Sequence, residues 1–307
     1  MRVLVVGAGA LGGYYGGRLA AAGREVGFLV RPPRADQIAQ HGLRIDSLKG
    51  NLELRPRTVL AGGLDGTYGL VLLAVKAYSL EAAMNDLAPA VGPGTAILPV
   101  INGMRHLDTL GARFGADRVL GGAAFITATL TPEGHVLHRV IPKDELVFGE
   151  VAGGTSERMR ALAGLFEGAG FEVRASGNVA QDMWEKWVIL AALAGMTCLM
   201  RTSIGDILAA PGGREALLGL FAECRAIATA AGHEPRPAFV GFAEGVLTTE
   251  GSPLVASMLR DIERGAPTEG ESILGDLAGR AERLGVAAPM LRLARLHVAA
   301  YEARRGQ

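Results

Sequence analysis

The chain opens on a short apolar run, Val3–Val6, and then passes into a glycine-rich stretch at 7–12. A continuous apolar run of this length is typical of a parallel strand that is buried on both faces. Apolar residues then recur at helical spacing over 10–22, and 25–30 is a second strand-like run. The order strand, glycine-rich turn, helix, strand predicts the first unit of a doubly wound α/β sheet.

The rest of the first half continues this alternation. Apolar runs at 70–75 and 95–100 predict two more buried strands, with a helix at 79–87 between them. A hairpin is predicted at 42–55, and further strands are predicted at 119–130, 145–149 and 171–174. We therefore expect an N-terminal Rossmann domain over residues 1–176, built on a mostly parallel sheet with some antiparallel strands.

The second half repeats apolar residues at spacings of three and four, which predicts helices almost throughout. The predicted helices are 179–200, 213–231, 238–247, 254–263, 269–284 and 289–304. The apolar run at 187–200 is interrupted by Gly195 and is shorter than the roughly 18–20 residues that span a membrane. We expect a buried helix there, inside an all-α substrate or dimerisation domain over residues 177–307.

Composition narrows the kinds of partner. Lys plus Arg and Asp plus Glu each number 31, so no strong charge points to nucleic acid or to an anionic membrane. The two cysteines, Cys198 and Cys224, form no CxxC motif and no cluster with histidine. This usage favours a reducing, cytoplasmic location and gives no indication of a metal site. A small-molecule ligand is the expected partner.

The glycine-rich stretch has the GxGxxG spacing of a dinucleotide site, and an ordinary glycine-rich turn is the alternative. In such a site the first glycine allows a tight turn, the second lets backbone N–H groups approach a pyrophosphate, and the third lets the helix pack closely. The predicted cofactor-binding residues are Gly7, Ala8, Gly9, Ala10, Leu11 and Gly12.

The residue after the second strand indicates which dinucleotide binds. NAD sites usually have an acidic residue there, whereas this chain has Arg31, with Arg34 close behind and no acid before Asp36. A guanidinium group matches the oxygens of a 2′-phosphate, so NADP(H) is expected rather than NAD(H). Two arginines in a solvated loop are the alternative.

Polar residues follow two of the predicted buried strands. Lys76 comes directly after the strand at 70–75, and Asn102 follows the strand at 95–100. Ligands of open α/β sheets bind beyond the carboxyl ends of the strands, so both side chains are candidates for cofactor contact. A solvated lysine and a plain Asn-Gly turn are the alternatives.

Three candidate residues for chemistry lie in the helical half. Lys186 begins a very apolar helix, where burial would lower its pKa and make it a proton donor for a carbonyl oxygen, although a lysine reaching to solvent fits equally. Glu269 precedes another helix and also fits an ordinary acidic first turn. Ser257 lies one helical turn before Asp261, where the two could share a face or form a surface pair.

Together these motifs resemble the ketopantoate reductase (2-dehydropantoate 2-reductase) family over essentially the whole chain. The matching segments are Gly7–Gly12, Arg31, Val-Lys76-Ala, Asn102-Gly-Met, Trp-Glu-Lys186-Trp, Ser257-Met-Leu-Arg-Asp261 and Pro-Thr-Glu269, followed by Gly285 and Pro289. The resemblance implies an NADPH-binding Rossmann domain, a helical domain and reduction of a 2-oxo acid, which is 2-dehydropantoate in pantothenate biosynthesis.

The resemblance also implies roles for individual residues. Lys186 would protonate the alkoxide and contact the substrate, and Glu269 would lie near both this lysine and the cofactor. Asn102 would contact the nicotinamide and the substrate, and Ser257 would bind the substrate. Lys76 and Arg31 would bind the cofactor. Separately from the resemblance, the apolar faces of the predicted helices in the second half suggest a homodimer.

The chain departs from the family in its predicted substrate pocket. Pantoate-forming members usually have asparagines at positions where this chain has Leu190, Ala194 and Ile204. Hydrogen bonds that select a polar substrate would be lost, with Thr197, Arg201, Thr202 or Ser203 as possible replacements. The alternatives are therefore a less polar 2-oxo acid or ketone, a non-catalytic NADPH-binding protein, or a hydroxyacid dehydrogenase of the 6-phosphogluconate or 3-hydroxyisobutyrate type.

Overall fold

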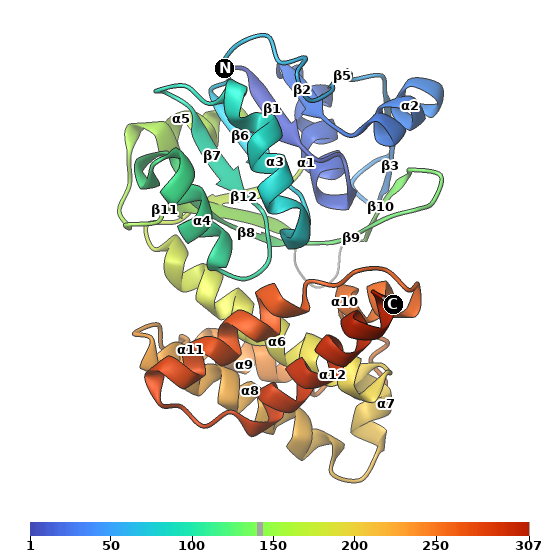
Figure 1. Ribbon diagram of the computed structural model, residues 1–307, viewed down its shortest axis with the longest axis vertical. Coiled ribbons are helices and arrows are strands. Elements are labelled where there is room, and N and C mark those ends of the chain that lie inside the picture. Colours follow the sequence, from blue (N-terminus) through green and yellow to red (C-terminus); the bar gives the residue numbers. More distant parts are fainter. Residues whose placement is uncertain (140–143, 307) are drawn as a thin grey trace. The chain divides into compact units, whose positions relative to one another are not determined.

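The chain packs as two compact units (Figure 1). The computed structural model describes residues 1–139 and 144–306. The first unit contains residues 1–101 and 106–180, and the second contains 102–105 together with the chain from 181 onward. The short segment 102–105 thus packs with the helical half, although it directly follows a strand of the first unit. The functional division expected at residue 176, between cofactor and substrate domains, stays a prediction.

The first unit alternates strands with helices. Its elements are β1 (Val3–Val6), α1 (Ala10–Ala21), β2 (Val26–Leu29), α2 (Pro32–His41), β3 (Leu43–Ser47), β4 (Leu52–Leu54), β5 (Arg57–Val59), β6 (Leu70–Leu73), α3 (Leu80–Leu87), β7 (Ala96–Pro99), α4 (Arg105–Phe114), β8 (Leu120–Phe125), β9 (Thr127–Leu130), β10 (Val136–Arg139), β11 (Glu145–Glu150), α5 (Glu157–Phe166) and β12 (Glu172–Ala175).

The main sheet has the strand order β5-β2-β1-β6-β7, and all its strands are parallel. Val3 and Val5 of β1 belong to the core cluster that contains Tyr15 of α1, whereas Leu4 and Val6 belong to the cluster that contains α3. This alternation buries both faces of β1, because successive side chains of a strand point to opposite faces. The predicted doubly wound sheet is confirmed.

Two smaller sheets complete the first unit, with orders β4-β3-β10-β9 and β12-β11-β8. The predicted hairpin at 42–55 is the antiparallel pair β3–β4. The strand predicted at 119–130 is instead two strands that join different sheets, β8 and β9. The burial pattern explains the break: β8 is almost wholly buried, while β9 is partly exposed.

Sequence patterning missed three helices of the first unit, namely α2, α4 and α5. In α2 and α4 few side chains are buried, Ile38 in α2 and His106 and Leu110 in α4, so the apolar repeat is short. Helix α5 begins at a conventional cap, where the Ser156 hydroxyl accepts a hydrogen bond from the Met159 N–H.

The second unit is helical. Its elements are α6 (Val179–Met200), which starts in the last residues of the first unit, α7 (Ile204–Ala209), α8 (Gly213–Ala230), α9 (Pro237–Leu247), α10 (Ser257–Glu263), the π-helical segment η4 (Glu271–Gly275), α11 (Asp276–Leu284) and α12 (Pro289–Arg305). The all-helical second half is confirmed. The helix predicted at 269–284 is divided into η4 and α11, and the one predicted at 254–263 begins only at Ser257.

Helix α6 forms the core of this unit. A Cβ atom on Gly195 would lie 2.7 Å from the Leu220 side chain of α8 and 3.3 Å from the Ala294 Cβ of α12, so these helices approach α6 closely. By length and composition α6 is apolar enough to cross a membrane, with a mean hydropathy of 1.3, and 67% of that stretch is buried inside the protein. The helix expected from the apolar run is thus a buried one.

We expect Gly12→Ala to destabilise the first unit. An added Cβ would lie 1.9 Å from the Gly7 carbonyl oxygen and 3.0 Å from the Ala74 Cβ. Because the nearest obstacle is backbone, α1 must move away from the sheet, at a cost of about 3 kcal/mol, the upper end of what overpacking usually costs. Urea unfolding would measure this cost. The matched control is Gly9→Ala, whose Cβ would meet no heavy atom within 4 Å. Equal stability of the two variants would contradict the prediction.

Candidate active site

The glycine-rich turn lies between the end of β1 and the start of α1. Gly7 has φ +89°, a conformation that favours glycine, and its N–H donates to the Leu29 carbonyl of β2. Gly9 precedes α1 in extended conformation, and the space where its Cβ would be is open. The turn therefore presents backbone to open space at the N-terminus of α1, the geometry that binds a pyrophosphate.

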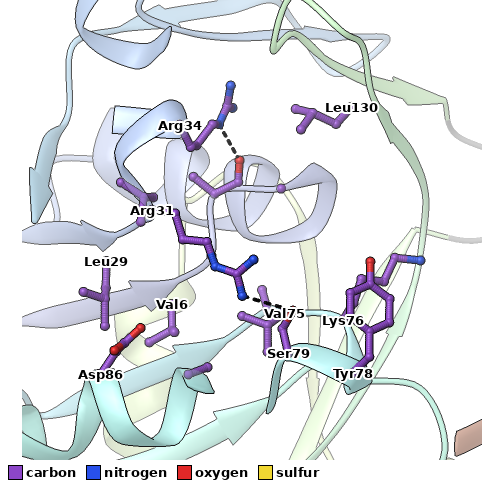
Figure 2. Close-up of a pocket in the computed structure, with 16 residues that line it drawn as sticks. Val6, Leu29, Arg31, Arg34, Val75, Lys76, Tyr78, Ser79, Asp86 and Leu130 are labelled. Carbon is purple, nitrogen blue, oxygen red and sulfur yellow. Dashed lines mark hydrogen bonds between the residues drawn. The ribbon is translucent and has the colours of Figure 1, made fainter. Parts of the chain in front are cut away.

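A pocket of about 340 Å³ opens beside this turn (Figure 2). Its walls come from the ends of β1, β2 and β6, from the segment before α3, from Ala83 and Asp86 of α3, and from Leu130 of β9. Its lining residues include Gly7, Ala8, Gly9, Arg31, Arg34, Lys76, Ser79 and Asp86. The structure thus brings Arg31 and Lys76 to the glycine-rich turn, although the three are far apart in the sequence. Ala10, Leu11 and Gly12 form the first turn of α1.

The two arginines of the pocket differ in what they contact. Arg31 is exposed, and its guanidinium donates to the Ser79 hydroxyl at 3.3 Å. Arg34 is half-buried and points away from Arg31 in Figure 2, with hydrogen bonds to the Ala8 carbonyl at 2.8 Å and to the Gly134 carbonyl at 3.1 Å. Burial lowers the pKa of Arg34. Arg34 therefore joins the glycine-rich turn to the β9–β10 hairpin, while Arg31 is placed to meet a ligand.

A second group of candidate residues lies in the helical unit. The Lys186 ammonium of α6 donates to the Asn102 side-chain oxygen at 3.2 Å. Gly103 has φ +83°, and a Cβ on it would lie 2.5 Å from the Ser272 carbonyl oxygen of η4, so the segment carrying Asn102 packs tightly against η4. The Trp187 indole N–H donates to the Ile273 carbonyl of η4 at 2.9 Å, and this hydrogen bond holds α6 against η4.

The electrostatic surroundings of Lys186 suit proton transfer near neutral pH. Burial lowers the pKa of Lys186 to about 8, and the charge of Glu269 opposes part of that shift. Glu269 is itself buried, with 5% of its surface exposed. It precedes η4, and its carbonyl accepts the N–H groups of Ser272 and Ile273. The structure thus brings Lys186, Asn102 and Glu269 together.

Ser257 is the first residue of α10 and is half-buried. Its neighbour Ala256 donates its N–H to the Thr197 hydroxyl of α6 at 3.4 Å. This contact places the start of α10 beside the half of α6 that is C-terminal to Lys186.

The face of α6 that carries Lys186 continues as apolar side chains. Ile189, Leu190 and Leu193 follow at helical spacing and are half-buried like Lys186, while Ala194 is fully buried. Ile204, at the start of α7, is also fully buried. The three positions at which the resemblance implies asparagines thus carry apolar side chains in the structure.

The hydroxyl groups considered as replacements are engaged elsewhere. Thr197 donates to the Leu193 carbonyl at 2.7 Å, which is an ordinary bond within the helix. Thr202 and Ser203 both donate to Asp206, where they cap α7. Arg201 is exposed, in a left-handed conformation with φ 58°. The half-buried side chains that follow Lys186 on α6, namely Ile189, Leu190 and Leu193, are thus all apolar, and we call them the apolar wall beyond Lys186.

An ionic network that sequence patterning missed anchors α6 next to Lys186. The buried carboxylates of Asp182 and Glu185 accept hydrogen bonds from the Arg236 guanidinium, which precedes α9, and Glu185 also accepts the Arg236 backbone N–H at 2.8 Å. The two carboxylates raise the pKa of Arg236. Nothing in the local sequence around Arg236 indicates this pairing, because its partners lie more than fifty positions away.

Comparisons with known proteins identify the family of this chain. The model of the ketopantoate reductase family matches residues 3–153, and the model of its C-terminal domain matches residues 178–302. This chain therefore belongs to the ketopantoate reductase family, a family of oxidoreductases.

Among the residues that the structure describes, no group of three His, Cys, Asp or Glu side chains is placed to hold a metal ion.

Individual relatives cover the whole chain. An uncharacterized oxidoreductase of Bacillus subtilis, YkpB, is 40% identical over 303 residues, which is 99% of both chains. A solved structure of 2-dehydropantoate 2-reductase from Methylococcus capsulatus is 32% identical, covers 100% of this chain and 98% of its own, and has a TM-score of 0.87. A D-mandelate dehydrogenase described with NADH and anilino(oxo)acetate shares the fold, with a TM-score of 0.90 at 21% identity and full coverage of both chains.

Proposed function

We propose that this protein reduces a 2-oxo acid to the 2-hydroxy acid with NADPH, with 2-dehydropantoate as the nominal substrate and pantoate as the product. The observation that carries the proposal is Lys186, whose pKa is lowered to about 8 while it donates to Asn102 and lies near Glu269. A reductase needs a proton donor for the carbonyl oxygen, and a donor works best when its pKa lies near the working pH.

The residues around the glycine-rich turn fit NADPH. The open space at Gly9 accommodates a pyrophosphate close to the backbone, and the exposed Arg31 guanidinium suits the 2′-phosphate. Lys76 adds a further cation to the same pocket. When bound, NADPH supplies the hydride that reduces the carbonyl carbon.

Residues of the protein then donate the proton and orient the substrate. Lys186 delivers a proton to the carbonyl oxygen as negative charge develops there. Asn102 holds the ammonium group by a hydrogen bond and offers its amide N–H to the substrate or the nicotinamide. Glu269 favours the protonated form of Lys186, and Ser257 is proposed to bind the substrate.

A less polar 2-oxo acid is the second candidate substrate, favoured by the apolar wall beyond Lys186. Leu190, Ala194 and Ile204 have no group that bonds the 4-hydroxyl of 2-dehydropantoate. The hydroxyl groups of Thr202 and Ser203 are bonded to Asp206. A buried hydroxyl without a partner loses the hydrogen bonds that it makes in water, which disfavours the polar substrate.

Removal of Lys186 is expected to slow NADPH oxidation by roughly two to four decades, the usual contribution of a positioned acid. In the wild-type protein kcat/KM should fall as the pH rises through about 8, because Lys186 loses its proton there. Rates of Lys186→Met across the pH range, with 2-dehydropantoate or its analogue lacking the 4-hydroxyl, test both points.

Lys186→Arg is the matched control for charge, because arginine keeps its proton at every pH used. If Lys186 is the proton donor, Lys186→Arg should also be slow, and its kcat/KM should no longer fall as the pH rises through about 8. Wild-type rates in Lys186→Arg would show that the residue acts only through its charge, and would contradict the proposed role.

Replacement of Arg31 tests the cofactor. Arg31→Ala is expected to weaken NADPH binding by roughly tenfold or more, since a charge-assisted hydrogen bond to the 2′-phosphate is removed, and to leave NADH binding unchanged. Fluorescence titration of both reduced cofactors measures this difference. Arg55→Ala, which removes an exposed arginine outside the pocket, is the control. Equal losses for NADPH and NADH would contradict the assignment of the 2′-phosphate to Arg31.

A further inference from the structure

The pocket contains one feature that the proposed function does not use, the carboxylate of Asp86. Asp86 lies on α3 and is half-buried. Figure 2 shows it beside Val6 and Leu29, with its carboxylate directed toward the interior of the pocket. Ala83, one turn earlier on α3, lines the pocket with it. This end of the pocket is therefore an apolar slot with a single carboxylate.

Asp86 is the one acid among the described residues that line the pocket, which also includes Arg31, Arg34 and Lys76. None of the interactions within the described part of the chain engages Asp86 in a hydrogen bond or an ion pair. Arg31 turns to the Ser79 hydroxyl, and the partners of Arg34 are neutral oxygens. A carboxylate that faces a pocket without a partner is an acceptor available to a ligand.

The order of chemical groups along the pocket matches one half of a dinucleotide. In the view of Figure 2, Arg31 lies between Arg34, which holds the glycine-rich turn at Ala8, and Asp86. A pyrophosphate suits the turn and a 2′-phosphate suits Arg31. The group beyond the ribose is adenine, which has two flat apolar faces and an amino group on its edge.

We infer that Asp86 accepts a hydrogen bond from the 6-amino group of adenine, with Val6, Leu29 and Ala83 against the faces of the base. The inference rests on the proposed binding of NADPH in this pocket. At this contact Asp86 favours adenine over hypoxanthine, because a carbonyl oxygen at position 6 presents an acceptor to the carboxylate where adenine presents a donor.

The test compares NADPH with reduced nicotinamide hypoxanthine dinucleotide phosphate, in which a carbonyl replaces the 6-amino group. Dissociation constants come from fluorescence titration of the wild-type protein and of Asp86→Asn, with unfolding midpoints recorded for both. Glu81→Gln is the matched control, because it removes an exposed acid from the same helix outside the pocket.

The wild type and Glu81→Gln should bind NADPH at least about tenfold more tightly than the hypoxanthine analogue, as expected for a hydrogen bond to a charged acceptor. Asp86→Asn should bind the two with nearly equal affinity, because its amide donates to the carbonyl as readily as it accepts from the amine. The wild-type comparison requires no variant to fold.

Equal binding of both cofactors by the wild type would overturn the inference and leave the proposed function standing. A preference that persists in Asp86→Asn would also overturn it, since the selection would then come from other groups. Failure of the wild type to bind NADPH at all would instead refute the proposed cofactor, and the inference with it.

Discussion

The close approach of α1 to the end of β1 is the constraint on which the first unit depends. The Gly7 carbonyl lies so near Gly12 that no side chain fits between them. This contact places the N-terminus of α1 directly at the carboxyl edge of the sheet, where backbone N–H groups and the helix dipole favour negative charge. Arg34 holds the turn from the other side through the Ala8 carbonyl. The pocket beside the turn exists because these contacts leave Gly9 uncovered.

In the helical unit the corresponding constraint is the placement of Lys186, which lies partly out of water beside Asn102 and the buried Glu269. An ammonium group loses hydration when it is buried, and the pKa of Lys186 falls accordingly. The hydrogen bond to Asn102 and the negative charge of Glu269 offset part of the hydration that the ammonium group loses. The contacts of Trp187 with η4 and of Glu185 with Arg236 hold the first turns of α6 on both sides of the lysine. The reactivity proposed for Lys186 therefore depends on packing around a single helical turn.

Much of the fold could be predicted from the sequence, because its signals are local. The run Val3–Val6, the glycine spacing and the repeats of the second half indicate buried strands, a phosphate-binding turn and helices, and the structure and the family match confirm the fold class and the resemblance. Helix α2 was missed because only Ile38 is buried in it. The division of 119–130 between two sheets depends on partners elsewhere in the chain, which a local pattern does not contain.

The sequence indicated which residues belong to the candidate site, but it did not indicate most of the contacts between them. Lys186 and Asn102 stand 84 positions apart and meet at 3.2 Å. The family resemblance implied that each contacts the substrate, but not that they contact each other. The sequence places Arg34 close behind Arg31 but does not indicate its partners, the Ala8 and Gly134 carbonyl oxygens, because their positions depend on the tertiary fold. Asp86 gave no signal at all, because an acid on an amphipathic helix usually faces solvent. The roles of these residues in binding and catalysis stay predictions.

The most direct test of this account is kcat/KM for NADPH oxidation with 2-dehydropantoate and with 3,3-dimethyl-2-oxobutanoate, which differ only in the 4-hydroxyl. We expect turnover, and the ratio of the two constants shows whether the apolar wall beyond Lys186 disfavours the substrate that carries the hydroxyl. A higher kcat/KM for 2-dehydropantoate would identify it as the better substrate. A higher kcat/KM for the compound without the hydroxyl would indicate that the protein acts on less polar 2-oxo acids. Tight binding of NADPH without turnover of either compound would contradict the central claim that Lys186 serves the reduction of a 2-oxo acid.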